Sequence, residues 1–345
     1  MKKESKQIIK RLALKFFCVL LLLVAMDVAY YFTLYQKDLD QHCPIKLLSQ
    51  KALTEQADIV YLAESSNGSH APYDTSTLPI STLIGEMLPE QQVSNLAQNA
   101  CHAAIYYDVL NNIPRSAPVK VAVVTVNMRS FGCEWIYSDL EPALQKWQVM
   151  MHPGPALYRR LLLGLSDIRP WNAAEREQLI LEKLKEQTLT PTATQPYRNA
   201  SEWDHAFAQA GMLYNGQPAT GDTLALACHH IKHFALTLDE TNPRIQDFDR
   251  IVQLCKKRGF TLVFNILAEN TDQIKDWVGP ELDQILHRNA EFVIQRYEPQ
   301  GVIVVNNLDA VRSSSFFEHE FPTEHYDFEG RKAIARNVAK ALKDR

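Results

Sequence analysis

The N-terminal segment constrains this chain most strongly, because a long apolar run follows a basic stretch there. Six basic residues come first: Lys2, Lys3, Lys6, Lys10, Arg11 and Lys15. Residues 16–34 then contain a single charged residue, Asp27. A helix needs about 20 apolar residues to cross a bilayer, and a basic flank favours the cytoplasmic side. We therefore expect a cytoplasmic stub at residues 1–11, a transmembrane signal anchor at 12–34, and the rest of the chain in the periplasm or at the cell surface.

A cleaved signal peptide is the alternative interpretation of this segment. Signal peptides have a shorter apolar region that ends in a small-x-small site. No good Ala-x-Ala sequence occurs here, which favours an uncleaved, single-pass anchor. Asp27 is a cost in a membrane span, and its place toward the outer end would let it reach water.

Composition sets wide limits on the rest of the protein. The chain has 345 residues, 46% of them hydrophobic, and a net charge of -4. This is ordinary globular composition, enough for one large domain or two small ones. The charge gives no general attraction to nucleic acid, so we expect no nucleic-acid partner. We also expect no cofactor.

Five cysteines lie beyond the anchor, in a space that would be oxidising. They are Cys43, Cys101, Cys133, Cys228 and Cys255. Five is odd, so at least one cannot pair within the chain. Cys101 and Cys133 each follow a predicted strand by a few residues, and we expect a disulfide between them.

Three histidines, His229, His230 and His233, fall on a helical stretch. No acidic or sulfur ligand matches them in the sequence. We interpret them as a polar helix face and expect no metal site.

Beyond residue 45, apolar strands alternate with amphipathic helices. The predicted strands are 59–62, 93–96, 119–126, 261–267 and 301–305, and the predicted helices are 46–58, 79–88, 103–110, 140–160, 175–187, 244–258, 282–297 and 330–342. This order is typical of a three-layer, doubly wound (flavodoxin-like) parallel α/β sheet. Residues 140–222 form an insertion, and Thr188–Asp222 reads as a long excursion that either caps a substrate site or is a plain surface loop.

Polar side chains follow two of the predicted strands, and another precedes the last predicted helix. Ser65 follows the strand 59–62, Asn127 follows the strand 119–126, and His325 precedes the last helix. Acyl transfer needs a nucleophile, a base and oxyanion donors. Ser65, His325 and Asn127 supply one of each, and backbone N–H groups near Ser65 and Ala100 could add donors.

Each of these residues also has a structural interpretation. Ser65 or its neighbour Ser66 could cap a helix, Asn127 could be a turn residue, and His325 could face solvent. The sequence leaves these alternatives open when each residue is taken alone.

Taken together, Ser65, Asn127 and His325 resemble the blocks of the SGNH (GDSL-like) hydrolase family. The first block is usually Gly-Asp-Ser, and Ala63-Glu64-Ser65 stands there. Ala100 takes the place of the second block's glycine, and Asn127 matches the third block's asparagine. The resemblance implies the SGNH type of sheet over about residues 45–345, with Ser65, Ala100 and Asn127 forming the oxyanion hole.

The last block departs most from this pattern. Family members often place an aspartate three residues before the histidine, and Pro322 stands there. Glu320 and Glu324 are the nearest acids that could orient His325. A Ser-His dyad supported by a backbone carbonyl is the alternative.

The anchor makes the chain most similar to membrane-anchored members of this family, which transfer D-alanine in teichoic-acid synthesis or acetylate envelope polysaccharides such as alginate. The resemblance implies a serine esterase that acts on an acylated envelope glycan or lipid. A second possibility is an O-acyltransferase that passes the acyl group from Ser65 to a polysaccharide, with a membrane-embedded acyltransferase as partner. A third is a binding module whose catalytic residues have decayed.

Overall fold

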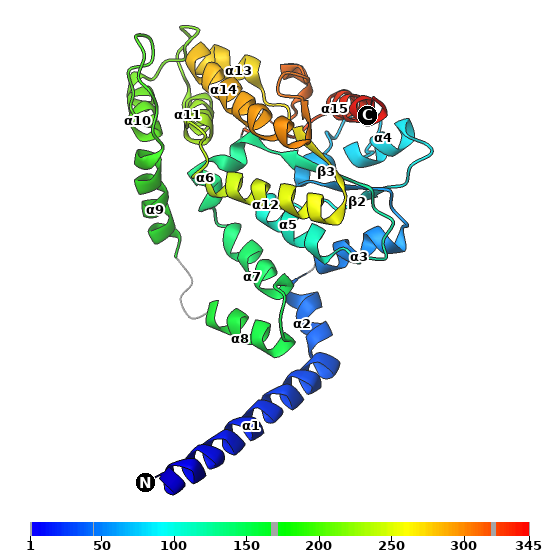
Figure 1. The fold of residues 1–345 in the computed structure, drawn as a ribbon. Coiled ribbons are helices and arrows are strands. Elements are labelled where there is room, and N and C mark those ends of the chain that lie inside the picture. The colour runs from blue at the N-terminus through cyan, green and yellow to red at the C-terminus, as the bar shows by residue number, and fades with distance from the viewer. Residues whose placement is uncertain (1, 44, 167–171, 319–321, 345) are drawn as a thin grey trace. The chain divides into compact units, whose positions relative to one another are not determined.

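The computed structural model describes residues 2–43, 45–166, 172–318 and 322–344 (Figure 1). The chain divides into two compact units. One comprises Met1–Lys46 and Gln145–Pro170, and the other comprises Leu47–Leu144 and Trp171–Arg345. The predicted insertion at 140–222 is therefore split between the two units.

The first unit is helical. Its elements are α1 (Lys2–Thr33), α2 (Tyr35–His42), most of α7 (Glu141–Met151) and α8 (Ala156–Ser166). In α1, the segment Lys6–Thr33 is long and apolar enough to cross a membrane, as its composition predicts. Asp27 of α1 accepts a hydrogen bond from the backbone N–H of Leu157 in α8, at 2.7 Å.

The second unit is built on one parallel sheet. Its strands are β1 (Ile59–Leu62), β2 (Val93–Asn95), β3 (Val121–Val126), β4 (Thr261–Ile266) and β5 (Ile303–Asn306). They are ordered β2-β1-β3-β4-β5, and every neighbouring pair is parallel. This is the flavodoxin-like order, whose switch point between β1 and β3 is where such sheets bind ligands. The predicted fold class is confirmed.

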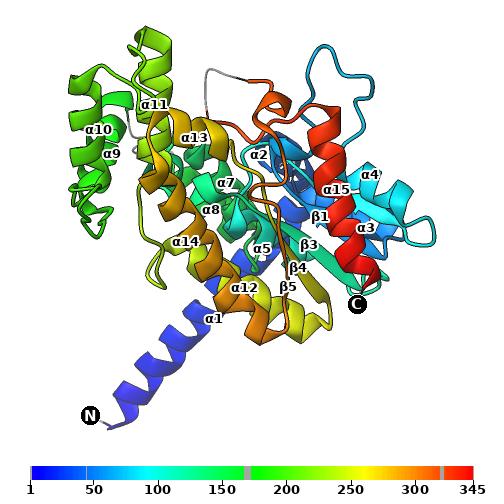
Figure 2. The same cartoon turned by 90° about the horizontal axis from the view of Figure 1, so that it is seen from above.

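Helices cover both faces of this sheet (Figure 2). Helices α4 (Ile80–Met87) and α15 (Phe328–Lys343) pack together on one face, and α5 (Ala103–Asn112) and α12 (Pro243–Arg258) pack together on the other. The remaining helices of this unit are α3 (Lys46–Thr54), α6 (Cys133–Ile136), α9 (Ala173–Glu186), α10 (Ala200–Ala210), α11 (Gly221–Phe234), α13 (Thr271–Trp277) and α14 (Pro280–Tyr297). Short 3₁₀ turns are η1 (Ser65–Asn67), η2 (Met128–Phe131), η3 (Glu298–Gln300) and η4 (Ser313–Ser315).

Side chains alternate between the two faces along each strand, and both faces are buried in the central strands β1 and β3 and almost all of β4. Tyr61 and Val123 join the core under α4 and α15. On the α12 side, the Phe264 ring lies edge-on to Phe248 and Tyr297, with centroid distances of 5.1 and 4.9 Å. Burying such a side chain stabilises a fold by about 1.5–3 kcal/mol. The carboxyl ends of β1 and β3 are thus held by a packed core.

Two expectations about local structure were wrong. The predicted helix 140–160 is two helices, because Pro153-Gly154-Pro155 interrupts it and Gly154 has a φ of 145°. The excursion 188–222 contains α10, which Asn199 caps by accepting from the N–H of Glu202, and which ends at left-handed Gly211. Asn199 and Gly211 were the residues in the sequence that could have indicated the two ends of α10.

The predicted disulfide is also wrong. Cys101 and Cys133 carry no bridge, and no disulfide joins any of the six cysteines, all of which are among the described residues. Burial raises the pKa of the Cys133 thiol to about 12. Its Sγ lies 3.9 Å from the carbonyl oxygen of Ile180 in α9, because the turns after β3 carry it into that contact.

Candidate active site

The site begins where β1 ends. The strand runs straight into η1, and Glu64 is the N-cap residue of this short turn. Ser65 therefore lies three residues after the end of β1, at the sheet's carboxyl edge and at the switch point of the strand order. The neighbouring strand continues alongside, since Gln98 N–H donates to the carbonyl of Ala63 at 3.0 Å.

Ser65, His325 and Glu318 form a hydrogen-bonded chain. His325 Nε2 lies 2.8 Å from Ser65 Oγ, and His325 Nδ1 lies 2.8 Å from Glu318 Oε2. An ionised carboxylate can only accept, so Nδ1 carries the proton and Nε2 accepts from the serine hydroxyl. This is the relation of nucleophile, base and orienting acid that activates a serine.

The sequence did not point to Glu318. It is brought to His325 by a small antiparallel bridge between Phe316 and Tyr326, in which Phe317 N–H donates to the carbonyl of His325 at 3.4 Å. The Phe317 ring also stacks on the imidazole, with centroids 6.0 Å apart. The only sign of this bridge in the sequence is the apolar pair Phe316-Phe317 before Glu318, and such a pair is a weak signal.

The two acids proposed from sequence have other outcomes. Glu320 lies outside the described residues. Glu324 does not take the position of the orienting acid, because its carboxylate bonds to Arg129 Nε and Nη2 (3.0 and 2.7 Å) and to Asn127 Nδ2 (2.8 Å). The acid at His325 is Glu318 instead.

The start of α15 fixes the chain after His325. Asp327 caps this helix by accepting from Gly330 N–H at 2.9 Å. A side chain at residue 330 would bring its Cβ within 2.8 Å of the Tyr326 Cβ. The glycine five residues after His325 is therefore required by this close approach.

Ser66 is turned away from His325. Its hydroxyl donates to Glu64 at 2.6 Å, and the same buried carboxylate accepts from Tyr106 and Thr125 at 2.8 and 2.9 Å. Three hydroxyl donors compensate the burial of this charge. Glu64, in the place of the family's usual aspartate, thus ties η1 to α5 and β3.

The predicted oxyanion donors lie in different settings. The Asn127 amide nitrogen donates to Glu324 and its oxygen accepts from Arg129 N–H, so the oxygen and one of the two amide N–H donors are engaged. Among the described residues, the backbone N–H groups of Ser65 and Ala100 make no hydrogen bond. Ala100 has a φ of 64°, the left-handed shape that glycine adopts most easily.

A buried charge network lies beneath the histidine. The Arg129 guanidinium lies over the Trp135 ring, 4.7 Å from its centroid, and pairs with Glu324. Burial, reinforced by the nearby Glu324 charge, raises the pKa of Glu269 well above its ordinary value. One Glu269 oxygen has no hydrogen-bond partner, as fits a neutral carboxyl group in this position.

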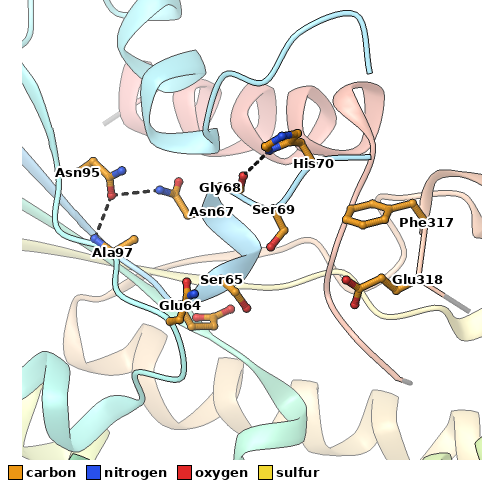
Figure 3. Close-up of a pocket in the computed structure, with 11 residues that line it drawn as sticks. Glu64, Ser65, Asn67, Gly68, Ser69, His70, Asn95, Ala97, Phe317 and Glu318 are labelled. Carbon is orange, nitrogen blue, oxygen red and sulfur yellow. Dashed lines mark hydrogen bonds between the residues drawn. The ribbon is translucent and has the colours of Figure 1, made fainter. Parts of the chain in front are cut away.

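An open pocket of about 480 Å³ adjoins Ser65 (Figure 3). Glu318 and Phe317 line one side, and His70 and Asn95 line others. Asn95 is held by Asn67 Nδ2 at 3.0 Å. No described residue of the insertion 140–222 is among the lining residues, so the pocket gives no support to a cap.

A second cluster lies around α11. His229 and His233 are one turn apart on this helix, and their ring nitrogens and a Glu134 oxygen lie within 4.8 Å of one another. No acidic residue stands at ligand spacing to these histidines in the sequence, and the fold brings Glu134 of α6 beside them. Two imidazoles and a carboxylate suit a divalent ion such as Zn²⁺. His230 turns elsewhere and contacts Gln273 at 3.1 Å.

No family model and no curated protein matches this sequence. Solved structures that it resembles include a lipase/acylhydrolase from Enterococcus faecalis (TM-score 0.36, 7% identity, 83% of this chain and 95% of that one) and the acetylxylan esterase Axe2 from Geobacillus stearothermophilus (0.37, 8%, 83% and 94%). Another is the α/β hydrolase LAE5 from the metagenome of Lake Arreo, Spain (0.35, 9%, 83% and 95%). At these values the likeness carries nothing about substrate or site residues.

Proposed function

We propose that this protein is a membrane-anchored serine esterase of the SGNH type, which removes an ester-linked acyl group from a cell-envelope glycan or lipid. The observation that carries the proposal is the chain of 2.8 Å contacts from Ser65 to His325 to Glu318. This chain stands at the sheet edge where such folds bind ligands. A decayed binding module would have no need to keep this geometry.

In the first half-reaction, Ser65 Oγ attacks the ester carbonyl carbon while His325 Nε2 takes the hydroxyl proton. The carbonyl oxygen becomes an oxyanion, and the N–H groups of Ser65 and Ala100 are its proposed donors. When the tetrahedral intermediate collapses, the bond to the alcohol breaks and His325 returns the proton to that leaving oxygen. The acyl group is now an ester of Ser65, and Glu318 has stabilised the imidazolium in between.

In the second half-reaction, His325 takes a proton from water as the water oxygen attacks the acyl-enzyme. Collapse of this intermediate releases the carboxylic acid and returns the proton to Ser65. A sugar hydroxyl could take the place of water without any change in these residues. In that case the product is an acylated polysaccharide, and a membrane-embedded acyltransferase supplies the donor.

The pocket supports a polar substrate. Amide, imidazole, hydroxyl and carboxylate groups line it, together with the flat ring of Phe317, a surface that suits a hydroxylated sugar ring. The apolar length of α1 supports retention at the membrane, which would bring the enzyme to envelope glycans and lipids.

The test is release of acid from an acetylated envelope polysaccharide, with Ser65→Ala as the inactive control. Water as acceptor predicts free acetate, whereas transfer predicts acetate on an added unacetylated glycan. If Ser65 is acylated but neither free acetate nor acetylated glycan forms, a partner protein is missing from the assay. Absence of any acylation of Ser65 by simple esters would contradict the proposal.

A further inference from the structure

Helix α8 carries large apolar side chains that the protein leaves uncovered. Tyr158, Leu161 and Leu165 are 49%, 59% and 53% exposed. They recur every three or four residues and so lie along one side of the helix. Such a stripe on an extracytoplasmic helix needs a covering environment.

The apolar side of α8 adjoins apolar side chains of α1. The two helices pack together in one unit, and a groove of about 880 Å³ lies between them. Leu20, Leu23 and Val24 of α1 line it from one side, while Leu161 and Leu165 line it from the other. Asp27 and Arg160 also line the groove, and each is paired within the unit. The other lining residues are mostly apolar, so the groove suits an apolar occupant.

A hydrogen bond to Asp27 holds the start of α8 beside α1. A carboxylate is costly inside a span, and the first N–H groups of a helix have no partner within that helix. The 2.7 Å bond from Leu157 N–H to Asp27 satisfies both groups. The positive end of the α8 dipole adds to this attraction.

The depth follows from helix geometry. Asp27 is seven residues before Leu34, about 10 Å along the helix axis at 1.5 Å per residue. The hydrocarbon core is about 30 Å thick. If the span ends near Leu34, the start of α8 lies within the outer leaflet.

Two basic side chains of α8 contact residues of α2. Arg160 Nε lies 3.1 Å from Asp38 in α2, and the Arg159 guanidinium lies over the Tyr35 ring, 4.9 Å from its centroid. Helix α2 follows the span directly. The basic groups are thus directed to the membrane surface, and the apolar stripe is directed away from it.

We propose that α8 is embedded in the outer leaflet beside α1, and that acyl chains of bilayer lipids fill the groove between them. This inference rests on the proposed membrane anchor and is independent of the esterase chemistry. It gives the protein a two-part membrane attachment, one helix that spans and one that inserts from outside.

The test uses the full-length protein in liposomes, with an environment-sensitive fluorophore on a single cysteine. Cys18 is replaced by serine, because it is exposed whereas the other five cysteines are buried. The label is placed at Leu161→Cys or Leu165→Cys, and the matched control is Leu181→Cys, an exposed leucine of α9. Quenching is compared between lipids that carry nitroxides on their acyl chains and iodide in the water.

We expect labels at 161 and 165 to be quenched by the lipid nitroxides and protected from iodide, and the label at 181 to behave in the opposite way. Gly164 lines the groove, and a side chain added there would meet no other atom. The leucine side chain of Gly164→Leu should therefore occupy part of the groove and reduce crosslinking to a phospholipid with a photoreactive acyl chain. Iodide quenching at 161 and 165 equal to that at 181 would overturn the proposal. Protection in native membranes but not in liposomes would overturn it too, in favour of a protein partner. Resistance to alkaline extraction tests the membrane anchor α1, and esterase activity tests the role of Ser65. Failure of either proposal can therefore be distinguished from failure of the proposal for α8.

Discussion

Arg129 and Glu324 are 195 residues apart in the chain and form two buried hydrogen bonds of 3.0 and 2.7 Å. Glu324 immediately precedes His325. The ion pair therefore connects the turn after β3 to the loop that presents the imidazole. We regard Arg129 and Glu324 as positioning residues, which act on the reaction through His325.

Arg129→Met should destabilise the protein strongly. Removing one partner of a buried ion pair leaves the other charge uncompensated, at a cost of about 3–5 kcal/mol. Urea denaturation measures the change in the free energy of unfolding. Lys120→Met is the matched control, since the Lys120 ammonium pairs with Asp58 while 71% exposed, and its effect should be far smaller. Equal effects would show that the buried pair is not special.

Glu318→Gln should lower kcat by about 10- to 100-fold with little change in thermal stability. Its side chain is 41% exposed, so the effect should be smaller than the roughly 10⁴-fold loss for a buried triad acid. Glu324→Gln should reduce stability and kcat together. Wild-type kcat in Glu318→Gln would favour a Ser-His dyad.

Asn127→Ala separates two roles for that residue. If its amide acts through Glu324, the variant should lose both thermal stability and kcat. Loss of a direct oxyanion donor would instead lower kcat by about 100- to 1000-fold at unchanged stability. The contacts to Glu324 and Arg129 favour the first result. Melting temperature and kcat measured on one preparation distinguish the two.

Glu269 should make stability fall as pH rises. Its pKa is raised in the folded protein, so above its ordinary value of 4.5 the folded state holds a proton that the unfolded state has lost. Stability from this group is complete below that value and declines up to the raised pKa. Glu269→Gln should flatten the slope of unfolding free energy between pH 5 and 8. An unchanged slope would assign the dependence to another group.

The sequence predicted the sheet well because its central strands are short apolar runs, of which β3 is strongly β-branched and buried on both faces, and the helices between the strands have clear apolar spacing. The sequence singled out Ser65 and His325 because each stands near a strand or helix boundary, and the structure places their side chains in contact. Their distance from one another, and the turning of Ser66 toward Glu64, depend on contacts that no local pattern encodes.

Three features could not be predicted for a common physical reason. Glu318 reaches His325 through a two-residue bridge, Glu134 meets His233 across two helices, and Asp27 caps α8. Each depends on partners brought together by tertiary packing. Glu318 lies seven residues before His325, farther along the chain than the neighbouring acids Glu320 and Glu324.

We propose that Ser65 is the nucleophile and that His325 is its base. Fluorophosphonate labelling followed by peptide mass spectrometry tests it most directly. We expect a single phosphonylated residue, Ser65. Labelling should be abolished in Ser65→Ala, slowed by orders of magnitude in His325→Ala, and retained in a Ser66→Ala variant that remains folded. Labelling that survives Ser65→Ala, or that is lost in folded Ser66→Ala, would contradict it.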